Sequence, residues 1–372
     1  MPHDDRIQQI AEARQAVLER GASPADPVVG AWHERAWLER SWRRCLKQGQ
    51  RPEQAVGFDV VPAAARRQAE DAHRTLLQAA RPEMERLARA VAPIRYFAIL
   101  TDAQGTVIET AGAIDRADRR ADAIARVGVD LSERSIGTSA IGAALGELQP
   151  VWLHRGEHFF HDTSVYSCAG APVFGPIGVC AGMLDLTGID ATERPELRHL
   201  VARAARSIED TLVLAQPSRL ALRIGWADDI GTDDGDGLLC LDADGLIVSA
   251  NSAARQMLPE LQAMARTAVQ AGEVFATPWQ SLFSRDMHDA RRVVPLWSGL
   301  RIGIRAHLSA AAPAPRGAPP GMPLKALQTQ LIRQAVREAH GNVADAARVL
   351  GVSRATVYRK LAPVRAERDA SR

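Results

Sequence analysis

Apolar spacing near the C-terminus predicts two short helices joined by a tight turn. In GNVADAARVLGVSRATVYRKL, residues 341–361, apolar side chains recur three and four positions apart, which places them on one helix face. Gly351 follows the first helix, and glycine is favoured where a chain turns sharply out of a helix. Ser353 is a good N-terminal cap for the second helix, because its hydroxyl can accept a hydrogen bond from a backbone N–H. This order is typical of a helix-turn-helix.

A longer apolar stripe from Leu324 to Ala339 precedes this motif and predicts a third helix. We therefore expect residues 324–372 to form an all-α domain. Ten Lys and Arg against four Asp and Glu give this segment a charge of +6, whereas the whole chain carries only +2. Contact with phosphates requires such a local excess, so double-stranded DNA is the expected partner. The alternative is a helical module that mainly dimerises, and salt-dependent DNA binding would separate the two.

The pattern GN-x3-AA-x2-LG-x-SR-x-T-x-Y-RK-L closely resembles the Fis-type helix-turn-helix of bacterial enhancer-binding regulators. The resemblance implies a homodimer whose second helix enters the major groove of DNA. It also implies that Arg354 reads a base, since arginine suits the O6 and N7 atoms of guanine. The residues expected to contact DNA are Ser353, Arg354, Ala355, Thr356, Tyr358, Arg359 and Lys360.

In the first 215 residues, the pattern predicts helices around an antiparallel sheet. Residues 1–60 indicate a helical segment, in which Trp42 and Cys45 share an apolar face that we expect to pack on the next domain. A helical run over roughly 62–92 is expected to break at Pro82. A hairpin around D-A-Q-G, a helix of small residues over 136–146, a second hairpin and a long helix over roughly 191–215 follow. The expected fold class is α+β, in several domains.

The order GTSAIG, PV, EHF and SCAGAPVFGPIGVCAGMLDLTG resembles the GAF sensor domain of acetoin-regulator-type activators. The SW-x-RC of those proteins is matched by Ser-Trp-Arg-Arg-Cys at residues 41–45. The resemblance covers roughly residues 30–215 and implies a GAF domain over 61–215. It implies that a small effector binds in the cup between the sheet and its covering loops. The residues at matching positions are Trp152, His158, Tyr166 and Cys168, with Tyr166 where the family commonly has Trp.

Residues 232–309 resemble a PAS domain more weakly. A strand, a D-A-D-G turn, a second strand and Asn251 at the start of a helix look like its first half, and RRVVPLW and LRIGIRAHL look like later strands. A structural role is as well supported as a second sensor. Residues 310–323 are rich in Ala, Pro and Gly, which indicates a linker.

The positions of the lysines exclude one class of ATPase. None of the three lysines follows a glycine, so the phosphate-binding motif G-x4-G-K-[ST] is absent. Enhancer-dependent activators carry an AAA+ ATPase between sensor and DNA-binding unit, and here the short linker stands in its place. ATP-dependent remodelling of alternative-sigma polymerase is therefore not expected, and ordinary RNA polymerase is the possible partner. No secretory signal or membrane span is visible, which predicts a cytoplasmic protein.

A cluster of possible metal ligands supports a third hypothesis, a metal or redox sensor. Imidazole and thiolate are ligands that transition metals prefer. A histidine bonded in a loop that lines the cup is the better supported interpretation, so neither a metal nor another cofactor is expected. No catalytic pattern stands out, and the predicted function is a ligand-responsive transcriptional regulator. The cluster comprises His154, His158, His161 and Cys168.

Overall fold

The computed structural model describes residues 3–19, 36–58, 71–226, 236–284 and 292–308, together with Val343. The side chains of residues 3–7 and 19 are outside the described set. The expected linker and, apart from Val343, the expected helix-turn-helix also lie outside the described residues.

The described chain begins with helices and continues into a first sheet of five antiparallel strands. The N-terminal elements are α1 (His3–Arg14), the π-helix η1 (Gln15–Glu19) and α3 (Ala36–Lys47), followed by α5 (Arg74–Val91) and η3 (Ala92–Ile94). The strands are β1 (Tyr96–Asp102), β2 (Val107–Ala111), β3 (Val151–His154), β4 (Tyr166–Phe174) and β5 (Cys180–Ile189), in the order β2-β1-β5-β4-β3. The other elements are α6 (Arg119–Ile124), α7 (Glu133–Ile136), α8 (Ala140–Glu147), η4 (Arg155–Glu157), η5 (His161–Thr163) and α9 (Leu197–Leu214).

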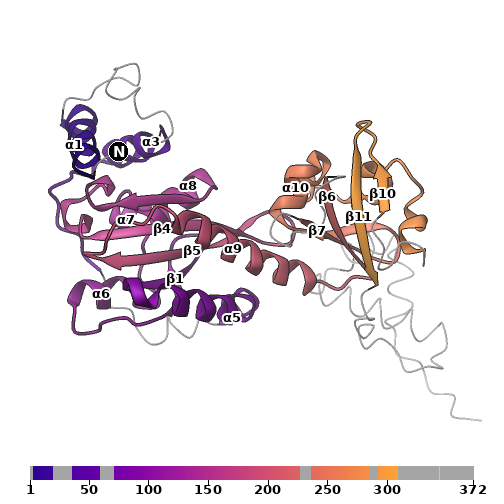
Figure 1. Cartoon of the computed structure of the whole chain (residues 1–372), viewed down its shortest axis with the longest axis horizontal. Helices are drawn as coiled ribbons and strands as arrows, with labels where there is room; N and C mark the ends of the chain where they lie inside the picture. Colours follow the sequence, from indigo (N-terminus) through magenta and orange to yellow (C-terminus); the bar gives the residue numbers. More distant parts are fainter. Residues whose placement is uncertain are drawn as a thin grey trace, which may run out of the picture. The chain divides into compact units, whose positions relative to one another are not determined.

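Both faces of the first sheet are buried. Helices α5 and α9 cover one face, where their apolar residues pack with alternate residues of β1, β4 and β5. We call the other face the cup face; α1, α3, α7, α8 and the Phe159–Phe160 segment share a core with it. In Figure 1, α1, α3 and α8 lie on one side of β4 and β5, and α5 lies on the other. A residue on a strand can therefore be buried in either of two different environments.

Helix α5 differs from the expectation that the helix breaks at Pro82. The helix runs unbroken from Arg74 to Val91 with Pro82 inside it. Pro82 is exposed, so the ring lies toward solvent and water can bond to the carbonyl group that loses its helical partner. Packing of the apolar face of α5 on the sheet then outweighs the local cost of the proline.

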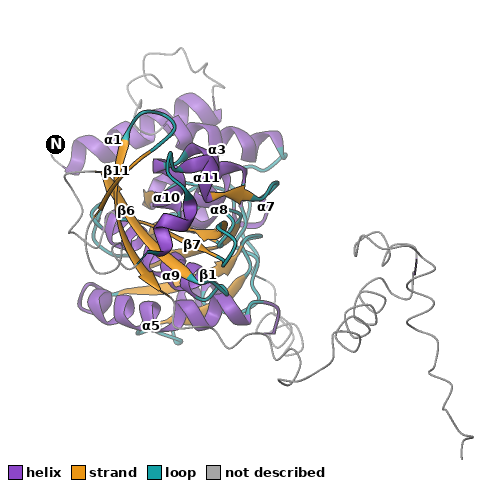
Figure 2. Ribbon diagram, turned by 90° about the vertical axis from the view of Figure 1, so that its right-hand side faces the viewer, coloured by secondary structure: helices purple, strands orange, loops and turns teal. Residues whose placement is uncertain are grey.

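A second antiparallel sheet follows α9. Its strands are β6 (Leu220–Trp226), β7 (Gly237–Leu241), β8 (Leu246–Ala250), β9 (Val269–Gln270), β10 (Arg292–Pro295) and β11 (Arg301–Leu308), in the order β10-β11-β6-β7-β8-β9. Between them lie α10 (Ser252–Met257), η6 (Pro259–Ala263), α11 (Ala271–Val274) and η7 (Trp279–Phe283). Figure 2 shows helices and strands interleaved in this part of the chain, and the α+β prediction is confirmed.

The start of the second sheet differs from the predicted boundary at residue 232. Strand β6 was not predicted, yet it pairs with both β7 and β11 in the middle of the sheet. The helix predicted to open at Asn251 is confirmed, because the Asn251 side chain caps α10 by accepting a hydrogen bond from the Ala254 N–H at 2.8 Å. The second sheet therefore begins at Leu220, before the predicted boundary.

Candidate effector site

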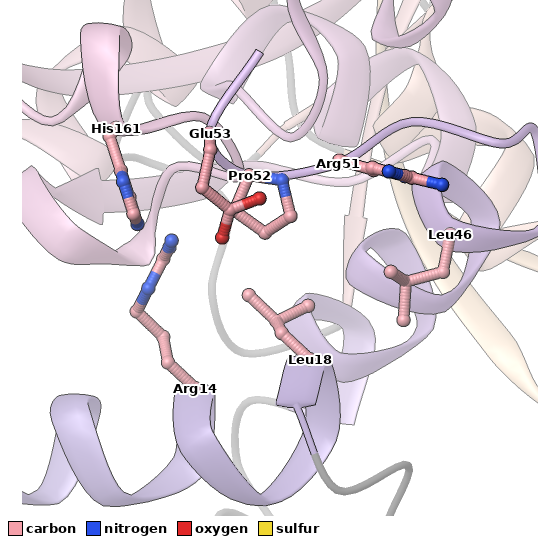
Figure 3. A pocket seen from close by; sticks show the side chains of 7 residues that line it. All are labelled: Arg14, Leu18, Leu46, Arg51, Pro52, Glu53 and His161. Atoms are coloured by element: carbon pink, nitrogen blue, oxygen red, sulfur yellow. The ribbon is translucent and has the colours of Figure 1, made fainter.

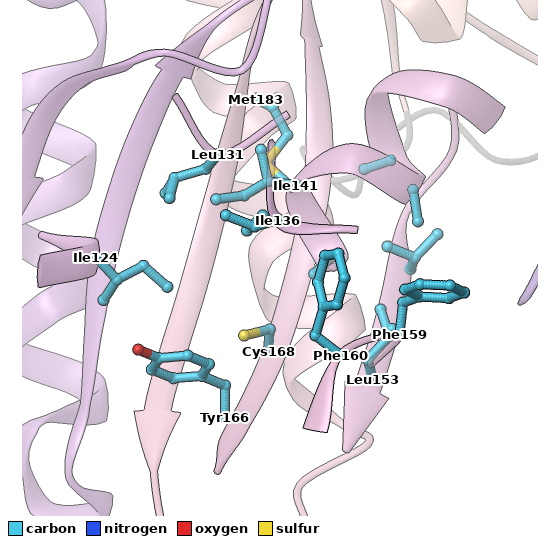
Figure 4. Close-up of a cluster of buried hydrophobic side chains, with 14 of the residues drawn as sticks. Ile124, Leu131, Ile136, Ile141, Leu153, Phe159, Phe160, Tyr166, Cys168 and Met183 are labelled. Atoms are coloured by element: carbon cyan, nitrogen blue, oxygen red, sulfur yellow. The ribbon is translucent and has the colours of Figure 1, made fainter. Parts of the chain in front are cut away.

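The register of β4 and β5 places a row of polar side chains on the cup face. Cys168 pairs with Thr187, and Gly170 pairs with Asp185 on the neighbouring strand. Tyr166, Cys168 and Met183 share a buried cluster with Phe159 and Phe160, as Figure 4 shows. Alternate residues of a strand point to the same face, so Asp185 and Thr187 face this cluster too. Two of the predicted effector contacts, Tyr166 and Cys168, therefore lie together.

Asp185 is a candidate that the sequence analysis missed. It lies in the middle of β5 and is fully buried. Its Oδ2 accepts a hydrogen bond from the Thr187 hydroxyl, whereas its Oδ1 has no partner among the described residues. Burial raises the pKa of the Asp185 carboxyl to about 7, an effect that the bond from Thr187 only partly offsets. The signal in the sequence was one acidic residue inside the apolar run of β5.

Tyr166 and Cys168 are also held by hydrogen bonds. The Tyr166 hydroxyl donates to the backbone carbonyl of Arg120 at 3.1 Å, and the Cys168 Sγ lies 3.5 Å from the Thr187 Oγ1. Burial raises the pKa of both the Cys168 thiol and the Tyr166 phenol, so both stay protonated at neutral pH. The Cys168 side chain thus acts as a neutral donor rather than as a thiolate nucleophile.

His158 lies beside Tyr166 and is neutral. The two rings meet edge to face with centroids 6.4 Å apart. The Nδ1 of His158 lies 3.0 Å from the carbonyl oxygen of Arg155, which requires the proton on Nδ1 and leaves Nε2 as an acceptor. Nε2 is buried without a partner among the described residues. Burial lowers the pKa of His158 to about 4, so the ring does not become charged near neutral pH.

Trp152, the fourth predicted effector contact, lies on the opposite face. In β3 it pairs with Ala169, and both belong to the core under α5 and α9. Its ring stacks on His154, with centroids 6.3 Å apart. The expectation that Trp152 lines the cup together with Tyr166 and Cys168 is therefore wrong, because successive strand residues point to opposite faces.

The four possible metal ligands are not brought together. His154 Nδ1 lies 2.6 Å from the Ser167 hydroxyl on the helix-covered face, whereas Cys168 lies on the cup face. His161 is exposed in η5. Within the described part of the chain, no group of three or more His, Cys, Asp or Glu side chains is placed to hold a metal ion.

The SW-x-RC residues bind α3 to α7, α8 and η4 on the cup face. Trp42 donates from its indole N–H to the carbonyl of Glu157 at 2.9 Å, and the Ser41 hydroxyl donates to Glu133 at 2.8 Å. Arg44 bridges Glu133 and Glu147 at 2.8 and 2.9 Å. Trp42 and Cys45 are buried in the core that α3 shares with the first sheet, so their apolar face packs on the part of the chain that follows. This motif therefore holds the cover of the cup in place.

Arg14 of α1 holds the segment around His158 in the same way. Its guanidinium donates to the backbone carbonyls of Gly156, His158 and Phe159 and lies over the Trp42 ring, 5.8 Å from its centroid. The N-terminal helices thus fix the backbone that positions His158.

A pocket of about 300 Å³ lies outside the cup, beneath the N-terminal helices. Figure 3 shows Arg14, Glu53 and His161 directed toward one another there. His161 is the one residue of the possible metal cluster that lines it, and none of the four predicted effector contacts does. Its lining residues are Arg14, Leu18, Leu46, Arg51, Pro52, Glu53 and His161.

All seven predicted DNA contacts, Ser353 to Lys360, lie outside the described residues. Among the described residues, no helix is both long and apolar enough to cross a bilayer.

The family described as "MimR, N-terminal domain" matches residues 9–210, which is more than half of the chain. The chain belongs to the MimR family. The same match runs from the middle of α1 through α3 and the whole first sheet, so the N-terminal helices are part of the family's domain. A second family, "Bacterial regulatory protein, Fis family", matches residues 323–362 and confirms the predicted Fis-type helix-turn-helix.

Relatives of this MimR-family chain carry regulatory names. The acetoin catabolism regulatory protein of Cupriavidus necator is 29% identical over 253 residues, which are 65% of this chain and 37% of that protein. The acetoin dehydrogenase operon transcriptional activator AcoR of Bacillus subtilis is 29% identical over 188 residues, 50% of this chain and 31% of that protein. The chain thus spans about a third of the length of these relatives. The solved E. coli DhaR(N)–DhaL complex matches 73% of this chain and 99% of that chain at 15% identity, with a TM-score of 0.44.

Proposed function

We propose that this protein is a transcriptional regulator that binds DNA as a homodimer through residues 341–361 and responds to a small effector held on the cup face. The Fis-family match over residues 323–362 is the observation that carries DNA binding. The regulatory names of the relatives and the local charge of +6 support the same function. The alternative, an adaptor whose C-terminal helices mainly dimerise, predicts no salt-dependent affinity for DNA.

The effector side of the proposal rests on the buried polar row of β4 and β5. We take the first sheet with its N-terminal helices as a GAF-type sensor and the second sheet as a PAS-like domain. Polar atoms without partners inside a closed apolar core are the kind of group that a ligand satisfies. Asp185 and His158 each present one such atom. No P-loop lysine is present in the sequence, so the regulator acts without that class of ATPase, on ordinary RNA polymerase or as a repressor.

Arg354→Ala tests the DNA-binding part of the proposal. If Arg354 reads a guanine, the substitution should cost about 1–3 kcal/mol on a selected operator and relax the preference for that base. Lys360→Ala is the matched control, because a phosphate contact should lower affinity for operator and random DNA equally. Fluorescence anisotropy at several salt concentrations measures the affinity of each variant for operator and random DNA. Equal losses on both DNAs for Arg354→Ala would remove its base-reading role, and no binding at any salt concentration would favour the adaptor.

The effector signal has a structural route out of the first sheet. The turn between β4 and β5 contacts the second sheet directly, since the Ala250 N–H donates to the Pro176 carbonyl at 2.8 Å. Buried Glu209 of α9 accepts hydrogen bonds from the Phe174 N–H at 3.1 Å and the Ser252 N–H at 3.0 Å. One carboxylate thus joins the end of β4 to the start of α10. A shift of β4 and β5 around an effector would move this junction.

Glu209→Gln should uncouple effector binding from DNA binding. The amide keeps one acceptor and turns a donor toward one of the two N–H groups, which costs about 1–3 kcal/mol for a buried unsatisfied group. We expect effector affinity to stay within a few-fold and the effector-induced change in operator affinity to fall severalfold. Glu196→Gln, an exposed change just before the same helix, should leave both unchanged. Full retention of the effector response by Glu209→Gln would show that the signal takes another route.

A further inference from the structure

Asp185 indicates which kind of hydrogen-bonding group a ligand on the cup face would supply. A buried carboxylate is costly unless its oxygens accept hydrogen bonds. The Thr187 hydroxyl satisfies Oδ2, but Oδ1 has no partner among the described residues. Neither Ile99 nor Gly170, the residues paired with Asp185 on the two neighbouring strands, carries a side-chain donor. When the carboxyl is ionised, the missing partner of Oδ1 must therefore be a donor from elsewhere.

The side-chain donors on the residues next to Asp185 already donate to other acceptors. The Thr187 hydroxyl has one proton, and Asp185 Oδ2 receives it. Cys168 lies 3.5 Å from the same Thr187 oxygen, so its thiol donates to Thr187 rather than to Asp185. The three side chains form a chain of donors that ends at the carboxylate. Nothing in that chain can supply a second proton to Oδ1.

A second buried atom without a partner among the described residues, on this side of the sheet, is also an acceptor. His158 carries its proton on Nδ1, because that atom faces the Arg155 carbonyl, and its buried Nε2 offers only a lone pair. His158 lies next to Tyr166, and Tyr166, Cys168, Thr187 and Asp185 follow in register along the face. Above a pH of about 7, where the Asp185 carboxyl is ionised, both unsatisfied ends of this row therefore accept hydrogen bonds, and neither donates.

The flexible Met183 side chain occupies the space beside Asp185. Gly170, directly opposite Asp185, has no side chain, and a Cβ built there would lie 2.2 Å from the Met183 methyl and 3.2 Å from the Ala140 carbonyl oxygen. The Met183 methyl thus fills the place that a side chain at position 170 would take. An unbranched thioether changes rotamer readily, so it can yield this place to a small guest.

We infer that the effector is a small molecule with a hydroxyl or amino group that donates a hydrogen bond to Asp185 Oδ1, in the place held by the Met183 methyl. This inference rests on the proposed function, because it assigns the ligand class of the same site. Carbonyl compounds of the same size accept hydrogen bonds but donate none, and the site discriminates against them for that reason.

Calorimetry on the full chain at pH 8, where the Asp185 carboxyl is ionised, tests the inferred ligand class with four-carbon probes. 1-Butanol and 1,4-butanediol donate hydroxyl protons, butylamine donates from an ammonium group, and 2-butanone donates nothing. A donor probe should bind the wild type about tenfold or more tightly than 2-butanone, as expected for one hydrogen bond to a charged group. Preference for butylamine over the alcohols identifies the amino group as the recognised donor, and the reverse identifies the hydroxyl.

Asp185→Asn should weaken the donor probe by about tenfold or more, because the carboxylate charge is lost. Ser167→Ala, a change on the opposite face of β4, is the matched control and should bind like the wild type. The comparison of probes on the wild type stands even if Asp185→Asn fails to fold. Equal affinity for 2-butanone, unchanged binding by Asp185→Asn, or no binding of any donor probe would overturn the inference. Operator binding measured on the same preparations shows whether the proposed DNA-binding function survives that outcome.

Discussion

Replacing Trp42 with alanine should lower the free energy of unfolding of the first sheet and its helices by about 3–5 kcal/mol. Trp42 is 1% exposed, its indole N–H donates to the Glu157 carbonyl, and the Arg14 guanidinium lies over its ring. Alanine removes the ring from the shared core and the indole N–H that donates to the Glu157 carbonyl. Urea unfolding of the full chain, followed by circular dichroism, measures the loss.

The same substitution should also weaken effector binding, because Arg14 and Trp42 together hold the segment that positions His158. Trp42→Phe separates the two contributions, since it keeps a buried six-membered ring but loses the N–H and the rest of the indole, at about 1–3 kcal/mol. Trp297→Ala is the matched control, because Trp297 is 67% exposed and should cost little more than its one hydrogen bond to Gly272. Equal losses for Trp42→Ala and Trp297→Ala would show that the N-terminal helices do not stabilise the cup.

Turns and caps were predictable because their chemistry is local. The D-A-Q-G turn predicted the hairpin of β1 and β2, and the Asp102 side chain does accept the backbone N–H groups of Gln104 and Thr106. Asn251 predicted the start of α10 for the same reason. Each of these signals lies within a few residues of the structure that it determines.

The face of each strand residue was not predictable. Every residue of β3, and all but the last of β4, is buried, so no alternation of polar and apolar side chains marks the two faces. Only the pairing of the strands reveals that Trp152 packs under the helices while Cys168 faces the cup. The same limit hid Asp185, whose role depends on Gly170 and Thr187 rather than on its own sequence neighbourhood.

The resemblance to acetoin-regulator-type activators identified residues that the hydrophobic pattern alone does not identify. The SW-x-RC match selected residues 41–45, and the structure explains them through bonds to Glu133 and Glu157 that lie about a hundred positions away. Such contacts leave no periodic signal in one sequence. The resemblance did not supply face or register, which is why Trp152 was assigned with the cup residues.

Asp185→Asn should make the protein more stable relative to the wild type as the pH rises from 4 to 8. Burial raises the pKa of the Asp185 carboxyl from 3.8 to about 7 in the folded chain. Between these values the unfolded chain releases the proton while the folded chain keeps it, so the wild type loses stability with rising pH. The loss is complete above the folded pKa and amounts to about 4 kcal/mol at 1.36 kcal/mol per unit. Asparagine does not titrate, so the Asp185→Asn variant does not lose this stability.

The difference between variant and wild type isolates this one carboxyl, because all other titrating groups are shared. Asparagine keeps an oxygen for the Thr187 hydroxyl, so the constant part of the difference should be small beside the pH-dependent part. Val173→Ala, a buried apolar change on the helix-covered face, should differ from the wild type by the same amount at every pH. Urea unfolding at pH 4.5, 6, 7 and 8 gives the three profiles. A flat profile for Asp185→Asn would mean that Asp185 ionises as it does in water, and that water reaches Oδ1. The carboxylate would then need no donor from an effector, so this measurement also bears on the inferred ligand.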